Sequence, residues 1–125
     1  MMRQAAFLAA GSLTACTAVS QDGPLDYQGV SVDNLGRDLV SVQVALSGIT
    51  VIEQVQAYAD CAAAQYALDE GYGYVRHLRR KVDQEGGIWR GDAVYTLSKT
   101  RPEGTNVIDA DSVVFACVEN GTPTV

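Results

Sequence analysis

The chain has 125 residues, 47% of them hydrophobic, and a formal net charge of −6 at pH 7. This length fits one domain of ordinary size. The acidic balance argues against nucleic acid as a partner, because phosphate groups are repelled by such a surface. No apolar stretch reaches the ~20 residues that a membrane-spanning helix needs.

The start of the chain has the layout of a secretory signal. Arg3 supplies a short positive region, and residues 4–15 carry no charge. Gly23 and Pro24 follow soon after this run, and such a break is not expected of a helix buried in a domain. The pattern predicts a signal peptide over residues 1–15.

Leu13-Thr14-Ala15-Cys16 resembles the lipobox of bacterial lipoproteins, in which one aliphatic and two small residues precede a cysteine. The resemblance implies cleavage before Cys16, a diacylglycerol on its sulfur and a further acyl chain, such as palmitate, on the new amino group. Two or three acyl chains together anchor a protein stably, whereas one binds reversibly. By the family's sorting rule, Thr17 after the cysteine implies the outer membrane, facing the periplasm, with inner-membrane retention or surface exposure as alternatives.

The predicted anchor indicates the state of the two remaining cysteines. With Cys16 lipidated, Cys61 and Cys117 are left as a pair in an oxidising compartment, and we expect a disulfide between them. Two buried free thiols are the alternative. We expect no metal site and no cofactor, because the chain has no Cys-x-x-Cys and His77 is its only histidine.

Two changes in composition divide the chain after the predicted cleavage site. Residues 16–37 contain glycine, proline and asparagine but few large apolar residues, and we predict that they form a lipidated N-terminus and flexible tether. We place the folded domain at residues 38–120 and a frayed tail at residues 121–125.

Strict alternation at the start of the domain predicts a strand with one buried face. The alternating apolar residues are Val40, Val42, Val44 and Leu46.

Residues 51–70 predict a long helix, since they are rich in alanine and contain neither glycine nor proline. Thr50 and Glu53 have the spacing of a capping box at the helix start. Gly71 is placed to end the helix in the left-handed conformation.

Three further strands are expected. Residues 72–82 and 88–98 flank a glycine-containing turn and predict a hairpin. Residues 112–119 are almost entirely apolar, which predicts a central strand covered on both faces. Cys117 on that strand would then face the helix that carries Cys61.

These elements add up to a single α+β domain of order β-α-β-β-β, with one long helix packed on a sheet of about four strands. The stretch YADCAAAQYALDEGYGYV is similar to small proteobacterial envelope lipoproteins of unknown function. That resemblance carries no functional motif onto this chain.

The sequence RHLRRK at residues 76–81 is the one basic island in an acidic chain. Alternation on a strand would place Arg76, Leu78 and Arg80 on one face. The candidate binding residues are Arg76, Arg79, Arg80 and Lys81, for phosphate or carboxylate groups of envelope polymers. The alternative is a solvated edge strand whose charges prevent unwanted pairing.

Trp89, beside the Gly86-Gly87 turn, is a candidate recognition residue, with hairpin packing as the alternative. The sequence offers few groupings of residues that could carry out catalysis. His77 lies among cations and has no evident orienting acid, and the carboxylates show no paired spacing for glycoside chemistry. We therefore do not expect an enzyme.

The sequence as a whole predicts a lipid-anchored envelope protein that acts by binding or as an accessory subunit in the periplasm. Its partners would be the membrane, through the anchor, and a protein or polymer of the envelope. The alternative is an inhibitor or chaperone-like module that adds an edge strand to its partner or projects a loop such as residues 99–109. An enzyme ranks third.

Overall fold

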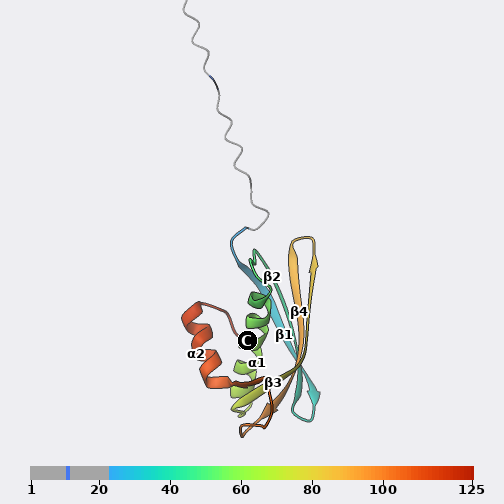
Figure 1. Ribbon diagram of the computed structural model, residues 1–125, viewed down its shortest axis with the longest axis vertical. Coiled ribbons are helices and arrows are strands. Elements are labelled where there is room, and N and C mark those ends of the chain that lie inside the picture. Colours follow the sequence, from blue (N-terminus) through green and yellow to red (C-terminus); the bar gives the residue numbers. More distant parts are fainter. Residues whose placement is uncertain (1–10, 12–22) are drawn as a thin grey trace, which may run out of the picture.

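Two helices and a five-stranded antiparallel sheet make up the described chain, which is residue 11 and residues 23–125 of a computed structural model (Figure 1). The strand order is β1-β2-β4-β3-β5. The α+β class and the single domain are confirmed, whereas the expected single helix and four strands are replaced by two helices and five strands. In chain order the elements are β1 (Asp26–Gly36), β2 (Leu39–Ser47), α1 (Glu53–Asp69), β3 (Tyr74–Glu85), β4 (Ile88–Ser98), β5 (Val107–Asp109) and α2 (Ala110–Asn120).

Strands β2 and β4 form the centre of the sheet, and their alternation sets its two faces. The apolar residues of β2 that alternate in the sequence are all buried, as predicted. They lie beside the buried residues of β4, because Val40 pairs with Tyr95 and Val42 with Ala93. The side of the sheet that carries these four side chains is the covered face, and the opposite side is the open face.

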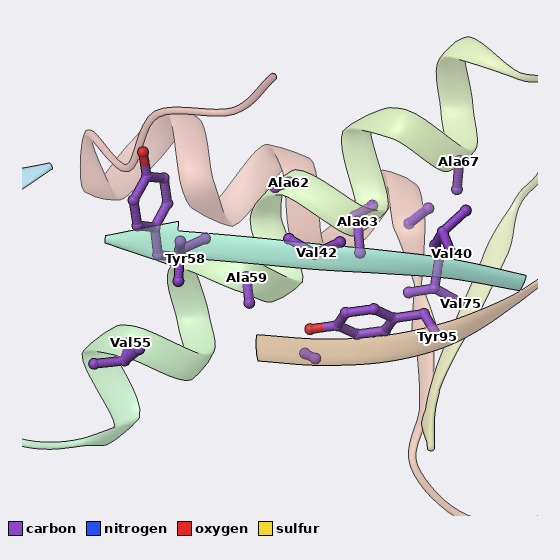
Figure 2. Packing of buried hydrophobic residues seen from close by; sticks show 14 of the residues in the cluster. Val40, Val42, Val55, Tyr58, Ala59, Ala62, Ala63, Ala67, Val75 and Tyr95 are labelled. Atoms are coloured by element: carbon purple, nitrogen blue, oxygen red, sulfur yellow. The ribbon is translucent and has the colours of Figure 1, made fainter. Parts of the chain in front are cut away.

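Helix α1 packs on the covered face through small side chains. Ala59, Ala63 and Ala67 recur every four residues, so they lie on one side of the helix. Figure 2 shows them directed toward β2 and toward Tyr95. Since alanine has only a Cβ, the helix axis can approach the strands closely. Gly71, at a φ of +86°, follows the end of the helix, as the sequence predicts.

The start of α1 differs from the predicted capping box. The side chain of Gln54 contacts the segment before the helix, and its Oε1 accepts hydrogen bonds from the backbone N–H groups of Thr50 (2.6 Å) and Val51 (3.2 Å). The amide side chain reaches back by one turn and holds the residues that lead into α1, whereas the N-cap residue, Ile52, makes no side-chain cap hydrogen bond.

The β3–β4 hairpin is confirmed with a tighter turn than expected. Only Gly86 and Gly87 lie between the strands, and both have positive φ, +57° and +82°. Two left-handed residues in a row give a turn whose twist matches that of the flanking strands. Residues 83–85, expected in the turn, therefore extend β3.

The predicted tether is wrong from Asp26 onward, because residues 26–36 form strand β1 along β2. Val30 and Val32 pack against the core from the covered face. Register shifts after Tyr27 and after Asn34 interrupt the alternation. The glycines gave the segment the composition of a linker, and the register shifts hid the alternation expected of a strand. The folded domain thus begins twelve residues earlier than the predicted start at residue 38.

The strand predicted at residues 112–119 is also wrong, since residues 110–120 form helix α2. The Asp109 side chain accepts a hydrogen bond from the backbone N–H of Ser112 at 3.2 Å, which caps the helix start. Gly121, at a φ of +70°, ends it. A short apolar run is compatible with either a strand or a helix, and here the two end signals decide the outcome.

The layers follow from these contacts. Helix α1 packs against β1 to β4, and α2 packs against α1 and β5. Figure 1 accordingly shows α1 between α2 and the central strands. Within residues 23–125 no helix lies over the open face of the sheet. Its side chains are therefore available to solvent or to a partner.

Gly91 on β4 is the position where the close approach of α1 can be tested. A Cβ there would lie 2.8 Å from methyl groups of both Val44 and Val55. Gly91→Ala is expected to lower the free energy of unfolding by about 1–3 kcal/mol, as overpacking does elsewhere. Urea titration measures the change. Gly73→Ala is the matched control, because its Cβ would meet only the Lys99 carbonyl oxygen, at 3.6 Å. Equal effects of the two substitutions would contradict the close approach of α1 to β4 at Gly91.

Candidate functional site

A β-bulge divides the basic island of β3 between the two faces of the sheet. His77 and Arg79 pair with consecutive residues of β4, so Leu78 is the extra, bulged residue. Beyond the bulge, Arg80 therefore lies on the covered face and not beside Arg76. The predicted alternation, with Arg76, Leu78 and Arg80 on one face, is wrong for this reason.

Arg80 forms a buried ion pair with Asp60 of α1. Its Nη2 donates to Asp60 Oδ1 at 2.7 Å and to Oδ2 at 2.6 Å. The hydroxyl of Tyr95 on β4 donates to Oδ1 at 2.6 Å. The two charged side chains are only 23% and 19% exposed. This polar cluster joins α1, β3 and β4, and it removes Arg80 from the candidate binding surface.

Burial dominates the titration behaviour of the cluster. Removal of Tyr95 from water, followed by the nearby Asp60 charge, raises the pKa of its phenol far above the usual range. Tyr95 therefore stays protonated and remains a hydrogen-bond donor. On the same face, burial and then the Arg80 charge lower the pKa of His77. The imidazole is thus held in its neutral form at pH 7.

The other cations of the island lie on or beside the open face. Arg79 is 3.7 Å from Asp92, and Lys81 is 3.7 Å from Asp83, and the four side chains are between 42% and 66% exposed. Such pairs contribute little to stability, with typical values of about 0.2–1 kcal/mol. Arg79 and Lys81 are therefore free to exchange these partners for a ligand at small cost.

The open face also has a shallow hollow, beside the bulge of β1. Its volume is about 260 Å³, and Arg90 stands at its margin. Gly29 and Ala45 pair across β1 and β2 at this point, and their small size leaves the space open. Ser31 donates a hydrogen bond to Gln43 at 3.0 Å along one side. The hollow thus offers one guanidinium and several neutral polar groups. Sequence reasoning missed it, because the residues come from three strands whose register the pattern does not give.

Trp89 does not belong to this open surface. It pairs with Leu46 of β2 and Gln84 of β3, which places it on the covered face. Its ring is partly buried against the core. This position fits packing of the hairpin, the alternative, and the recognition role of Trp89 stays a prediction.

The predicted cysteine pair lies between the two helices. The sulfur atoms of Cys61 of α1 and Cys117 of α2 lie in disulfide geometry, with Cα atoms 6.0 Å apart, a separation typical of disulfides. Because residues 110–120 are helical, the bridge would join two helices rather than a helix and a strand. Cys16, the predicted lipidation residue, lies outside the described residues.

A metal site and a membrane-spanning helix are two further possibilities for the described residues. No group of three or more His, Cys, Asp or Glu side chains that could hold a metal ion is found within them. No helix among them is both long enough and apolar enough to cross a membrane.

Comparisons with known proteins give one family and one relative. The family of the YNQ4 C-terminal domain matches residues 27–121, which run from within β1 to the end of α2. The chain is also similar to a Paracoccus denitrificans protein described as "Uncharacterized 26.9 kDa protein in nqo8 5'region". The two are 35% identical over 106 residues, which cover 80% of this chain and 42% of the relative. The chain thus spans less than half of that relative's length. No solved structure matches.

The ion pair predicts different effects for two neighbouring arginines. Arg80→Gln leaves Asp60 buried without its cation, and we expect the free energy of unfolding to fall by about 3 kcal/mol. Arg79→Gln removes only an exposed pair and should change it by less than about 0.5 kcal/mol. Chemical denaturation of both variants gives the comparison. If Arg79→Gln is as destabilising as Arg80→Gln, the assignment of the buried pair fails.

The single histidine allows a direct check of its environment. An NMR titration of the His77 ring should give a midpoint below the ordinary value of about 6.5, because burial and Arg80 disfavour the imidazolium ion. In denaturing urea the midpoint should return to that ordinary value. Since the unfolded chain then binds the proton more readily, this residue lowers the stability of the fold as pH falls through about 6.5. A midpoint above the urea value would refute the proposed environment.

Proposed function

The chain belongs to the YNQ4 C-terminal domain family, and we propose that this member is a lipid-anchored envelope protein that acts by binding, or as an accessory subunit, in the periplasm. Cys16, at the end of Leu13-Thr14-Ala15-Cys16, would carry the lipid. The outer membrane is the proposed site, by resemblance to the lipoprotein sorting rule at Thr17. The role assigns no catalytic residue and no cofactor.

The observation that carries the binding role is the open face of the sheet. Both helices pack on the other side, so the open face presents its polar groups to solvent. The hollow beside Arg90 and the cations Arg79 and Lys81 lie along this face. Guanidinium and ammonium groups bind carboxylates and phosphates. A protein or polymer of the envelope that carries such groups is the proposed partner.

The cysteine pair supports an oxidising compartment. Cys61 and Cys117 lie in disulfide geometry across the two helices, and disulfides persist in the periplasm but are rare in the cytosol. The proposed anchor and the proposed bridge therefore require the same route of export.

A second candidate function is the addition of a strand to a partner. Strand β5 pairs with β3 only at residues 74–76, so within the described chain the rest of that edge, residues 77–85, has no neighbour. An extended peptide could pair there through its backbone. In that case the amide protons of residues 77–85 would become protected from exchange when the partner binds.

Membrane fractionation and intact mass measurement test the anchor. Wild-type protein should remain with membranes after a salt wash, and its mass should match a chain that begins at Cys16 and carries acyl groups. Cys16→Ser should leave the membrane fraction, because the sulfur that accepts the lipid is gone. A wild-type polypeptide that begins at Met1 with no acyl mass would overturn the proposal. Alkylation of Cys61 and Cys117 without reductant would independently overturn the proposed bridge.

A further inference from the structure

Helix α2 presents an apolar surface that no other part of the described chain covers. Phe115 and Val118 are 67% and 71% exposed, the highest values for large apolar side chains in the described chain. They lie three residues apart and therefore on one side of the helix. Asp111 and Glu119 lie one turn before and one turn after Phe115, and both are exposed. We call these four residues the α2 patch; it has an apolar centre and an acidic margin.

Strand β3 presents a second surface of opposite charge. Leu78, the bulged residue, is 51% exposed and lies just beyond the end of β5. Arg76 lies two residues before it, Arg79 comes next after it, and Lys81 follows, exposed like Arg79. Arg79 and Lys81 lie 3.7 Å from Asp92 and Asp83, and they would exchange these exposed partners for carboxylates of the other molecule. We call these four residues the β3 patch; it has an apolar centre and a basic margin.

The two patches match each other in their apolar centres and in the opposite charges of their margins. Contact between them would remove Phe115, Val118 and Leu78 from water, and burial of apolar surface drives association. The acidic margin of one patch would face the basic margin of the other, and such complementarity favours this pairing over others. The chain as a whole carries a net charge of −6, so two copies repel each other. A cationic surface is therefore the place on this molecule where another copy can approach an acidic helix.

We propose that the α2 patch of one molecule docks on the β3 patch of a second copy. Because the two surfaces differ, the contact is head-to-tail. Each molecule keeps one free patch of each kind, so the contact can extend to a third copy or close into a ring. The interface is small, since it centres on three apolar side chains, and small interfaces are weak and transient. This inference does not depend on the proposed lipid anchor.

The test uses the full chain carrying Cys16→Ser, so that lipid attachment does not contribute to self-association. Sedimentation equilibrium should show a mass that rises with protein concentration. Phe115→Glu and Leu78→Glu should each remain monomeric, since either substitution places a charge in one of the apolar centres. Val51→Glu is the matched control, because Val51 is 52% exposed but belongs to neither patch. Circular dichroism verifies that all variants keep the fold.

Mixing the two variants is the decisive measurement. Phe115→Glu keeps an intact β3 patch, and Leu78→Glu keeps an intact α2 patch, so an equimolar mixture should form dimers and nothing larger. A mixture that stays monomeric would overturn the proposal, as would a wild-type background that is monomeric at every concentration or a Val51→Glu variant as defective as the others. Binding to phosphatidylglycerol vesicles that Phe115→Glu abolishes, without self-association, would assign the α2 patch to lipid instead.

Discussion

The close packing of helix α1 on the sheet is the constraint on which the rest of the structure depends. Alanine at positions 59, 63 and 67 faces β2 and β4, and glycine at position 91 leaves room for Val55 on the helix side. At the positions of these alanines the helix lies too near the strands for bulky side chains to fit between them. The core therefore gains its apolar area from the strand residues, above all from the valines of β2 and from Tyr95.

The same packing determines where charged side chains are buried. Asp60 lies on α1 between positions that face the sheet and positions that face α2, and it reaches both Arg80 and Tyr95. A buried pair of this kind is weak evidence for high stability, because desolvation offsets much of the attraction. Its geometric requirements are strict, however, since one carboxylate must accept bonds from two different strands. The cluster therefore fixes how far along the sheet the helix can sit.

Elements with an unbroken pattern could be predicted from the sequence. The alternation of β2, the alanine-rich helix and the glycine turn of the hairpin each carry a local signal that tertiary contacts did not override. Strand β1 was missed because its bulges break the period, and α2 was missed because a short apolar run has no period to distinguish helix from strand. The cap at Asp109 and the glycine at 121 were the signals that could have identified α2.

The candidate site was less accessible to sequence reasoning than the fold. The composition of the basic island was evident, but one bulged residue, Leu78, decides which of its cations face the helix and which face solvent. The hollow beside Arg90 depends on the pairing of three strands, and pairing is a long-range property. The position of Trp89 on the covered face likewise follows from strand register rather than from the nearby turn.

The proposed bond between Cys61 and Cys117 has a consequence for helix α2. Helix α2 has only Ala110 and Cys117 fully buried, so noncovalent packing holds it loosely. Loop closure over 56 residues removes about 4 kcal/mol of chain entropy from the unfolded state in the simplest treatment. Without the bond, the last helix would open far more readily than the sheet. The redox potential of the surroundings would then determine whether α2 stays docked on α1 or becomes a mobile arm.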